Sequence, residues 1–423
     1  MTARTVRRAP GKVMVAGEYA VLEPGRPAVV AAVDRYVTVG ASTDGDFGGA
    51  DVVVASDLLD REVRLGRDGE RLDALPGQDP APVRGVLGHV VSVVETVGRL
   101  RTEQGLGLAP VRLSVRSELH HGGVKTGLGS SAAVTVACVR TLLDLYGMRL
   151  SAEDRFRLAL LATVRVDAGP SGADLAAATR RGWVSYRSPD RRALRDGLHR
   201  NGVAHTLRAH WPGLAVRSLP PPDGAALHVG WSGTPASTSA LVADLAARPG
   251  RESASRVRFL DESEECVTAV ERALRRDGPE ALLDAVRTAR GLLSRLDEET
   301  SLGIVTASLH ELCEVAESCG AAAKPSGAGG GDCGIALLPA HCSAGLLHRR
   351  WTAAGITPLP LRVADGAGPE PGPVAAPERG PGPGPGPAPG TRLHGTAPAS
   401  GRRSGPEARS SPETPPSPQG RTR

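Results

Sequence analysis

The chain has 423 residues with a formal net charge of +5, and only 11 of them are aromatic: three Phe, four Trp and four Tyr. Residues 366–423 hold seven arginines against four glutamates, so +3 of that charge lies there and only +2 on the other 365 residues. A nearly neutral body argues against a nucleic-acid partner, and no apolar stretch reaches the roughly 18 residues of a membrane span. The six cysteines form no CxxC pair, which is typical of a cytoplasmic protein with reduced thiols.

Residues 366–423 differ in composition from the rest of the chain. They contain 15 prolines and 12 glycines and no aromatic residue. Such a segment cannot bury enough surface to offset the entropy lost on ordering. We therefore predict a disordered tail, for which the sequence identifies no partner. The remaining 365 residues are enough for two packed domains.

Apolar periodicity predicts the elements of the first domain. In chain order they are strands at residues 29–40 and 51–56, a helix at 82–104, a strand at 111–116, helices at 131–146 and 151–164, and a strand at 182–186. Residues 207–222 are expected to be irregular. They end in three consecutive prolines, Pro220, Pro221 and Pro222, which we take as the boundary between domains at 1–220 and 221–365.

The second domain is expected to alternate strands with amphipathic helices. The predicted elements are a strand at 226–231, helices at 252–276, 279–298 and 306–319, and strands at 333–338 and 358–363 around a helix near 342–354. Strands interrupted by such helices indicate an α+β fold.

Lysine is rare in this chain, because 48 of its 51 basic residues are arginine. The three lysines, Lys12, Lys125 and Lys324, each stand beside a glycine-rich segment. A lysine ammonium is a compact point charge, whereas a guanidinium is a wide planar fork. This placement predicts one crowded anionic site that holds all three lysines, and chance placement of surface lysines is the alternative.

The segment from Gly127 to Ala132 is expected to bind phosphate. Gly127 and Gly129 permit a tight turn that approaches a ligand closely, and Ser130 and Ser131 are predicted N-cap residues of the following helix. Free N–H groups at a helix start favour anions, and the hydroxyls can reach Mg²⁺. An ordinary capped helix is the structural alternative.

Two known nucleotide motifs fit this chain poorly. It contains no G-x-x-x-x-G-K-[S/T], so it has no P-loop of that type. Residues 127–132 match the loose dinucleotide pattern, but about ten residues separate them from the preceding predicted strand. Residues 329–334 match it as well but lead into a strand. The small residues at 326–334 have little packing value, and we expect them to close over the site.

Three segments, residues 9–19, 127–131 and 324–332, resemble in this order the three motifs of the GHMP kinase superfamily. The resemblance implies a two-domain fold with a ribosomal-S5-like N-terminal domain and a ferredoxin-like C-terminal domain, and ATP with Mg²⁺ as cofactors. Within the superfamily the chain most resembles phosphomevalonate kinases. Mevalonate kinases typically have Gly-Glu-His where this chain has Gly17, Glu18 and Tyr19.

The resemblance implies ATP-dependent phosphorylation of 5-phosphomevalonate to 5-diphosphomevalonate on the mevalonate route to isoprenoids. Two alternatives stay open. In the first alternative, the chain is a mevalonate kinase or another small-molecule kinase of the superfamily. In the second, it is a non-catalytic protein that binds nucleotide without turnover.

The resemblance also implies residue roles. Lys12 and Asp174 match the catalytic pair. A structural alternative exists for Asp174, because a negative charge in the first turn of a helix interacts favourably with the helix dipole. The positions matched to ATP are Gly127, Leu128, Gly129, Ser130, Ser131 and Ala132, with Ser131 as the magnesium ligand. Those matched to substrate are Lys125, Ser326 and Ala328. Mevalonate kinases have a magnesium-binding Glu eleven residues before the catalytic Asp, where this chain has Thr163.

Overall fold

The computed structural model describes residues 4–121, 124–248 and 253–365, so the predicted tail lies outside the described residues. Within them, eight strands form one sheet in the order β10-β9-β2-β6-β3-β4-β5, with β1 paired to β2. Only β3 and β6 run parallel. The strands are β1 (Arg4–Ala16), β2 (Pro27–Ser42), β3 (Val52–Ser56), β4 (Val63–Asp68), β5 (Arg71–Ala74), β6 (Val111–Ser117), β9 (Trp183–Arg187) and β10 (Ala215–Leu219). A short hairpin of β7 (His120–His121) and β8 (Val124–Lys125) follows β6.

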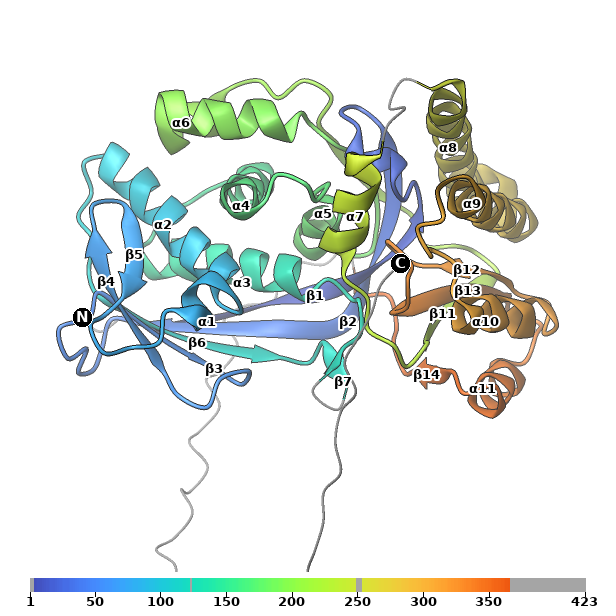
Figure 1. Ribbon diagram of the computed structural model, residues 1–423, viewed down its shortest axis with the longest axis horizontal. Helices are drawn as coiled ribbons and strands as arrows, with labels where there is room; N and C mark the ends of the chain where they lie inside the picture. Colours follow the sequence, from blue (N-terminus) through green and yellow to red (C-terminus); the bar gives the residue numbers. More distant parts are fainter. Residues whose placement is uncertain (1–3, 122–123, 249–252, 366–423) are drawn as a thin grey trace, which may run out of the picture. The chain divides into compact units, whose positions relative to one another are not determined.

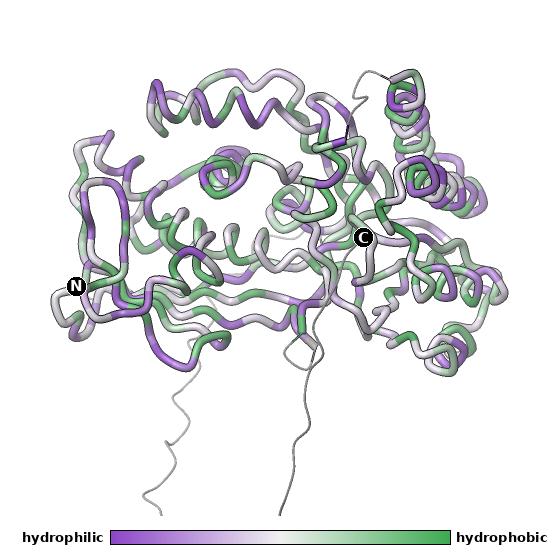
Figure 2. The backbone as a smooth tube through the Cα atoms, viewed as in Figure 1, coloured by the Kyte–Doolittle hydropathy of each residue, from purple (hydrophilic) through white to green (hydrophobic). Residues whose placement is uncertain are grey.

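Helices cover one face of this sheet (Figure 1). They are α1 (Ala81–Arg84), α2 (Gly88–Glu103), α3 (Ser130–Leu145), α4 (Ala152–Val166), α5 (Ala173–Arg180) and α6 (Arg191–Arg208). Helix α3 buries most of its side chains, because it lies between the sheet and the outer helices. Figure 2 shows the polarity that follows, with hydrophobic segments on the inner strands and a largely hydrophilic α6 on the outside.

The later part of the chain builds a second, antiparallel sheet in the order β12-β13-β11-β14. Its strands are β11 (Ala225–Trp231), β12 (Ala322–Pro325), β13 (Cys333–Pro339) and β14 (Thr357–Leu359). The helices of this part are α7 (Thr238–Ala247), α8 (Ala254–Arg272), α9 (Gly278–Thr300), α10 (Ala307–Glu317) and α11 (Ala344–Ala353), with a π-helical segment at Ala273–Asp277. Helices pack on both faces of this sheet, because Ile335 and Leu337 of β13 face the core with α9, whereas Ala336 and Leu338 face α10 and α11. An antiparallel sheet covered by helices is the α+β arrangement that the sequence predicts.

The triple proline separates the last strand of the large sheet from the first strand of the small one. The chain then returns to the large sheet at its described end. The amide of Asp34 donates to the carbonyl of Arg362 at 2.9 Å, and the amide of Ala364 donates to Ala32 at 2.9 Å. The domain limits 1–220 and 221–365 therefore stay a prediction, since the last residues hydrogen-bond across them.

The prediction of irregular structure at 207–222 is wrong, because β10 lies inside this segment and pairs with β9. The strand is at the edge of the sheet and most of its side chains are exposed or half-buried, so it lacks the apolar alternation that identifies a strand. Helices α6 and α7 were missed for a related reason. Helix α6 is rich in arginine, and α7 buries no side chain.

Two expected elements are shorter than predicted. The helix expected at 82–104 breaks at Gly85 into α1 and α2, and the strand expected at 358–363 ends at Leu359. None of the helices in the described ranges combines the length and hydrophobicity that crossing a bilayer requires.

Candidate active site

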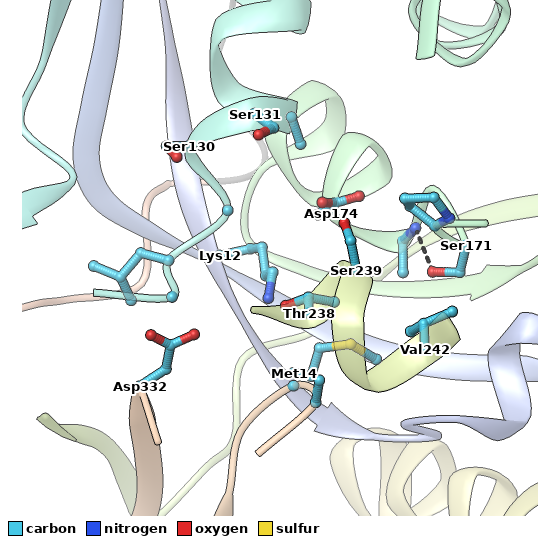
Figure 3. A pocket seen from close by; sticks show the side chains of 18 of the residues that line it. Lys12, Met14, Ser130, Ser131, Ser171, Asp174, Thr238, Ser239, Val242 and Asp332 are labelled. Atoms are coloured by element: carbon cyan, nitrogen blue, oxygen red, sulfur yellow. Dashed lines mark hydrogen bonds between the residues drawn. The ribbon is translucent and has the colours of Figure 1, made fainter. Parts of the chain in front are cut away.

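A cavity of about 500 Å³ brings together segments from the whole described chain. Its walls are strand β1, the segment 126–132 with the start of α3, the start of α5, residues 236–242 at α7, and part of the segment 326–332. Figure 3 shows Lys12, Asp174 and Ser131 on one side of this space, with Thr238 and Ser239 of α7 facing them. All of the predicted ATP-side residues line it.

The glycine-rich segment has the local geometry of an anion site. Gly127 and Gly129 both have positive φ, at 74° and 80°, which glycine adopts without strain. The carbonyl of Leu128 accepts a 2.8 Å hydrogen bond from the amide of Lys12, and this bond fixes the loop on β1. The predicted N-cap role of Ser130 and Ser131 is wrong, because Gly129 is the N-cap and the serines form the first turn of α3. Their amides are among those that a helix leaves without an internal partner, and these residues line the cavity.

We expect Gly127→Ala to lower kcat/KM for ATP by about 100-fold. An added Cβ would lie 2.5 Å from the carboxylate of Asp332, and a shift of about 1 Å in an active site costs roughly this factor. Steady-state kinetics with ATP as the varied substrate measures the effect. The matched control is Gly147→Ala, since Gly147 has a similar φ of 64° with nothing within 4 Å of the added Cβ. Equal losses of kcat/KM in both variants would mean that backbone strain, and not the clash with Asp332, lowers the activity.

Lys12 and Asp174 approach each other around Gly129. A Cβ at Gly129 would lie 3.1 Å from Cγ of Lys12 and 3.7 Å from Cβ of Asp174. Lys12 extends from β1, and Asp174 stands in the first turn of α5 after a left-handed Gly172. Within the described ranges Lys12 forms no salt bridge, so its ammonium is available to a ligand. The predicted pair therefore lines one cavity.

Lys125 and Asp332 add two further charged groups to the lining. Lys125 is exposed on β8, and Asp332 is buried in the third segment with a positive φ of 54°. Burial raises the pKa of Asp332, while the amide of Ala236 and the charges of Lys12 and Lys125 oppose that rise. The amide of Ala236 donates to the Asp332 carboxylate at 3.0 Å, so Asp332 also anchors the approach to α7.

Lys324 does not reach the cavity, which corrects the prediction that all three lysines share an anionic site. Its side chain is fully buried and forms an ion pair with Glu18, itself 4 % exposed. The ammonium also donates to the carbonyl of Pro325 at 2.6 Å. Lys324 therefore holds the start of the third segment, and its charge is already neutralised.

The two substrate-side residues of the third segment have different positions. Ser326 is buried outside the cavity, where its hydroxyl accepts from the amide of Met14 at 2.8 Å and donates to the carbonyl of Met14 at 3.1 Å. These hydrogen bonds attach the third segment to β1, and the substrate contact expected of Ser326 stays a prediction. Ala328 does line the cavity, and its carbonyl accepts a 2.6 Å hydrogen bond from Tyr19.

Several lining residues were missed by the sequence analysis, among them His89, Asp167, Thr238 and Ser239. Burial lowers the pKa of His89, and the charges of Asp174 and Asp167 oppose that shift. Its Nδ1 is buried without a hydrogen-bond partner among the described residues. No local pattern marks these residues, because they come from α2, the end of α4 and the exposed helix α7.

The oxygen donors at the cavity suit a magnesium ion that is carried by a nucleotide. Within the described chain no three His, Cys, Asp or Glu side chains gather as a metal cluster. Mg²⁺ in kinases is held by one or two protein groups together with phosphates and water. Ser131 and Asp174 can provide such groups. Thr163 lines the cavity, and its hydroxyl donates to the carbonyl of Ala159 at 3.0 Å.

Comparisons with known proteins agree with this geometry. The chain matches the family models "GHMP kinases N terminal domain" at residues 89–182 and "GHMP kinases C terminal" at 271–356. It is 51 % identical over 362 residues to a phosphomevalonate kinase from Streptomyces sp. strain CL190, covering 85 % of this chain and 97 % of that protein. A mevalonate kinase from Thermococcus onnurineus is 27 % identical, with coverage of 86 % and 97 %.

A solved structure gives the same result. Streptococcus pneumoniae phosphomevalonate kinase in complex with phosphomevalonate and AMPPNP is 28 % identical and matches with a TM-score of 0.72, over 85 % of this chain and 99 % of that one. The expected fold is thereby confirmed. Because 51 % of the residues aligned with the Streptomyces relative are identical, over 97 % of the relative's length, the chain belongs to the phosphomevalonate kinases of the GHMP kinase superfamily.

Proposed function

We propose that this protein transfers the γ-phosphoryl group of ATP to 5-phosphomevalonate, giving 5-diphosphomevalonate and ADP on the mevalonate route to isoprenoids. The relative at 51 % identity and the neighbour solved with phosphomevalonate and AMPPNP support this assignment. The observation that carries it is the joint placement of Lys12 and Lys125 in one cavity with the start of α3. Within the described residues neither lysine is in a salt bridge.

Two lysines whose ammonium groups can bind anions favour an acceptor substrate that carries a phosphate group. A phosphate monoester has a second pKa of about 6, so it is largely a dianion at neutral pH. Its oxygen attacks the γ-phosphorus of ATP while the bond to the bridging oxygen of ADP breaks, and no proton has to be removed. The barrier is then the mutual repulsion of two anions, which fixed positive charges lower.

The chain's own groups divide this work. The amides at the start of α3, with Gly127 and Gly129, bind the phosphates of ATP. Lys12 lies between the loop and the third segment, with Nζ 3.7 Å from where a Cβ of Gly327 would stand, and we assign it to the transferring group. Asp174 orients Lys12 and the acceptor. Ser131 and Asp174 would hold Mg²⁺, which would supply further positive charge to the phosphoryl oxygens.

A product assay tests the proposal directly. Purified protein is given mevalonate, 5-phosphomevalonate or 5-diphosphomevalonate in parallel with MgATP, and products are identified by mass. We expect turnover of 5-phosphomevalonate in preference to the other two. Preferred turnover of mevalonate would contradict the assignment, and nucleotide binding without any transfer would support the non-catalytic alternative.

Lys125→Arg is expected to raise KM for the phosphorylated acceptor about tenfold and to leave kcat nearly unchanged. Its charge acts on the bound acceptor and on the transition state alike, which is the signature of uniform binding. The planar guanidinium fills a different volume from the ammonium it replaces. KM for ATP, measured in the same variant, is the internal control. A tenfold loss in kcat with an unchanged acceptor KM would assign Lys125 to the transferring group instead.

A further inference from the structure

Tyr19 is held in a backbone conformation that a tyrosine rarely adopts. It precedes the short 3-10 helix Ala20–Leu22 with φ 60° and ψ −45°. A non-glycine residue in such a region is strained and persists only where its surroundings determine it. The structure therefore contains a compensating interaction for this residue.

That interaction is a half-buried hydrogen bond to the third segment. The Tyr19 hydroxyl donates to the carbonyl of Ala328 at 2.6 Å, across 309 residues of sequence. The side chain is 4 % exposed and lines the cavity together with Ala328. Burial, followed by the charges of Asp297 and Glu18, raises the pKa of Tyr19, so the hydroxyl keeps its proton at neutral pH and remains a donor.

The residue before Tyr19 holds the neighbouring position of the same segment. The carboxylate of Glu18 pairs with Lys324 and accepts from the amide of Gly327 at 3.4 Å. Glu18 therefore holds the backbone of Gly327, and Tyr19 holds the backbone of Ala328. The far part of the segment is fixed separately, since the amide of Gly330 donates to Ile304 at 2.9 Å.

This attachment sets the wall that faces Lys12. Gly327 and Ala328 line the cavity, and Lys12 Nζ lies 3.7 Å from where a Cβ of Gly327 would stand. Nucleotide phosphates are assigned to the amides at the start of α3. We propose that Tyr19 is a positioning residue for the acceptor, acting through the Ala328 carbonyl to hold the 327–328 backbone at its distance from Lys12. The inference rests on the proposed phosphoryl transfer but not on the identity of the acceptor.

Tyr19→Phe tests the inference, because the ring keeps its packing and only the hydroxyl is lost. One hydrogen bond corresponds to about a fivefold effect in an equilibrium. We expect KM for the acceptor to rise about fivefold, with KM for ATP changed less than twofold. Hydrogen–deuterium exchange of peptides covering 326–331 should become at least about threefold faster, since the amides of Gly327 and Gly330 lie in this segment.

The matched control is Tyr146→Phe. It removes the same hydroxyl from the C-cap residue of α3, which lines none of the described cavities. We expect both KM values and the exchange of 326–331 to stay unchanged in this variant. Equal changes of the two KM values in Tyr19→Phe, or unchanged exchange of 326–331, would overturn the inference.

The wild-type enzyme separates this inference from the proposed function. If it phosphorylates an acceptor other than 5-phosphomevalonate, the proposed substrate is wrong. The changes in KM for that acceptor and in KM for ATP are then compared between Tyr19→Phe and the wild type. A selective rise in that acceptor's KM still supports the role of Tyr19, and its absence overturns it.

Discussion

Lys12→Arg is expected to lower kcat about 100-fold with little change in stability, although the charge is preserved. The aliphatic part of Lys12 already passes close to Gly129, since a Cβ there would lie 3.1 Å from its Cγ and 3.2 Å from its Cε. A guanidinium is larger and planar, so it cannot take the position of the ammonium unless the glycine backbone moves. A displacement of about 1 Å at the reacting group costs roughly 100-fold, or about 2.7 kcal/mol.

Steady-state kinetics and thermal melting of the variant check this result. The matched control is the reverse exchange on the same strand, Arg7→Lys. Arg7 pairs with Asp144 at 2.6 Å outside the cavity, so this variant should keep wild-type kinetics. Near-wild-type parameters for both Lys12→Arg and Lys125→Arg would mean that the placement of the lysines beside glycine loops is chance.

The second large effect is on stability. Lys324→Met is expected to destabilise the folded protein by about 3–5 kcal/mol, because it leaves the charge of the buried Glu18 carboxylate without a cation to neutralise it. Adding Glu18→Gln to this variant should restore part of the loss, since the buried charge is then removed. Thermal and urea unfolding of the single and double variants measure both effects.

An exposed ion pair provides the control for Lys324. Arg287→Met breaks the pair with Glu317 at 3.0 Å, where the arginine side chain is 43 % exposed. Solvent screening limits such a pair to about 0–1 kcal/mol. If Lys324→Met cost no more than Arg287→Met, the Glu18–Lys324 pair would not stabilise the fold. Loss of kcat without loss of stability in Lys324→Met would instead return Lys324 to the catalytic site.

Features that arise within a few neighbouring residues could be predicted from the sequence. The turn at Gly127 and Gly129 and the start of α3 follow from local backbone preferences, and the long apolar helices follow from their periodicity. The clustering of Lys12 and Lys125 in one cavity was also predictable, because each lies beside a segment that must approach a ligand closely. Even here the exact cap was misassigned, since Gly129 rather than a serine precedes the helix.

The packing of distant elements determines which partner each side chain meets. Lys324 has the same local signature as the other two lysines, yet Glu18 lies 306 residues away and neutralises it in the core. Ser326 bonds to Met14 across 312 residues, and the exposed helix α7 brings Thr238 and Ser239 to the cavity. Propensity and periodicity act over a few residues, whereas such pairings depend on how distant elements pack, so no local pattern contains them.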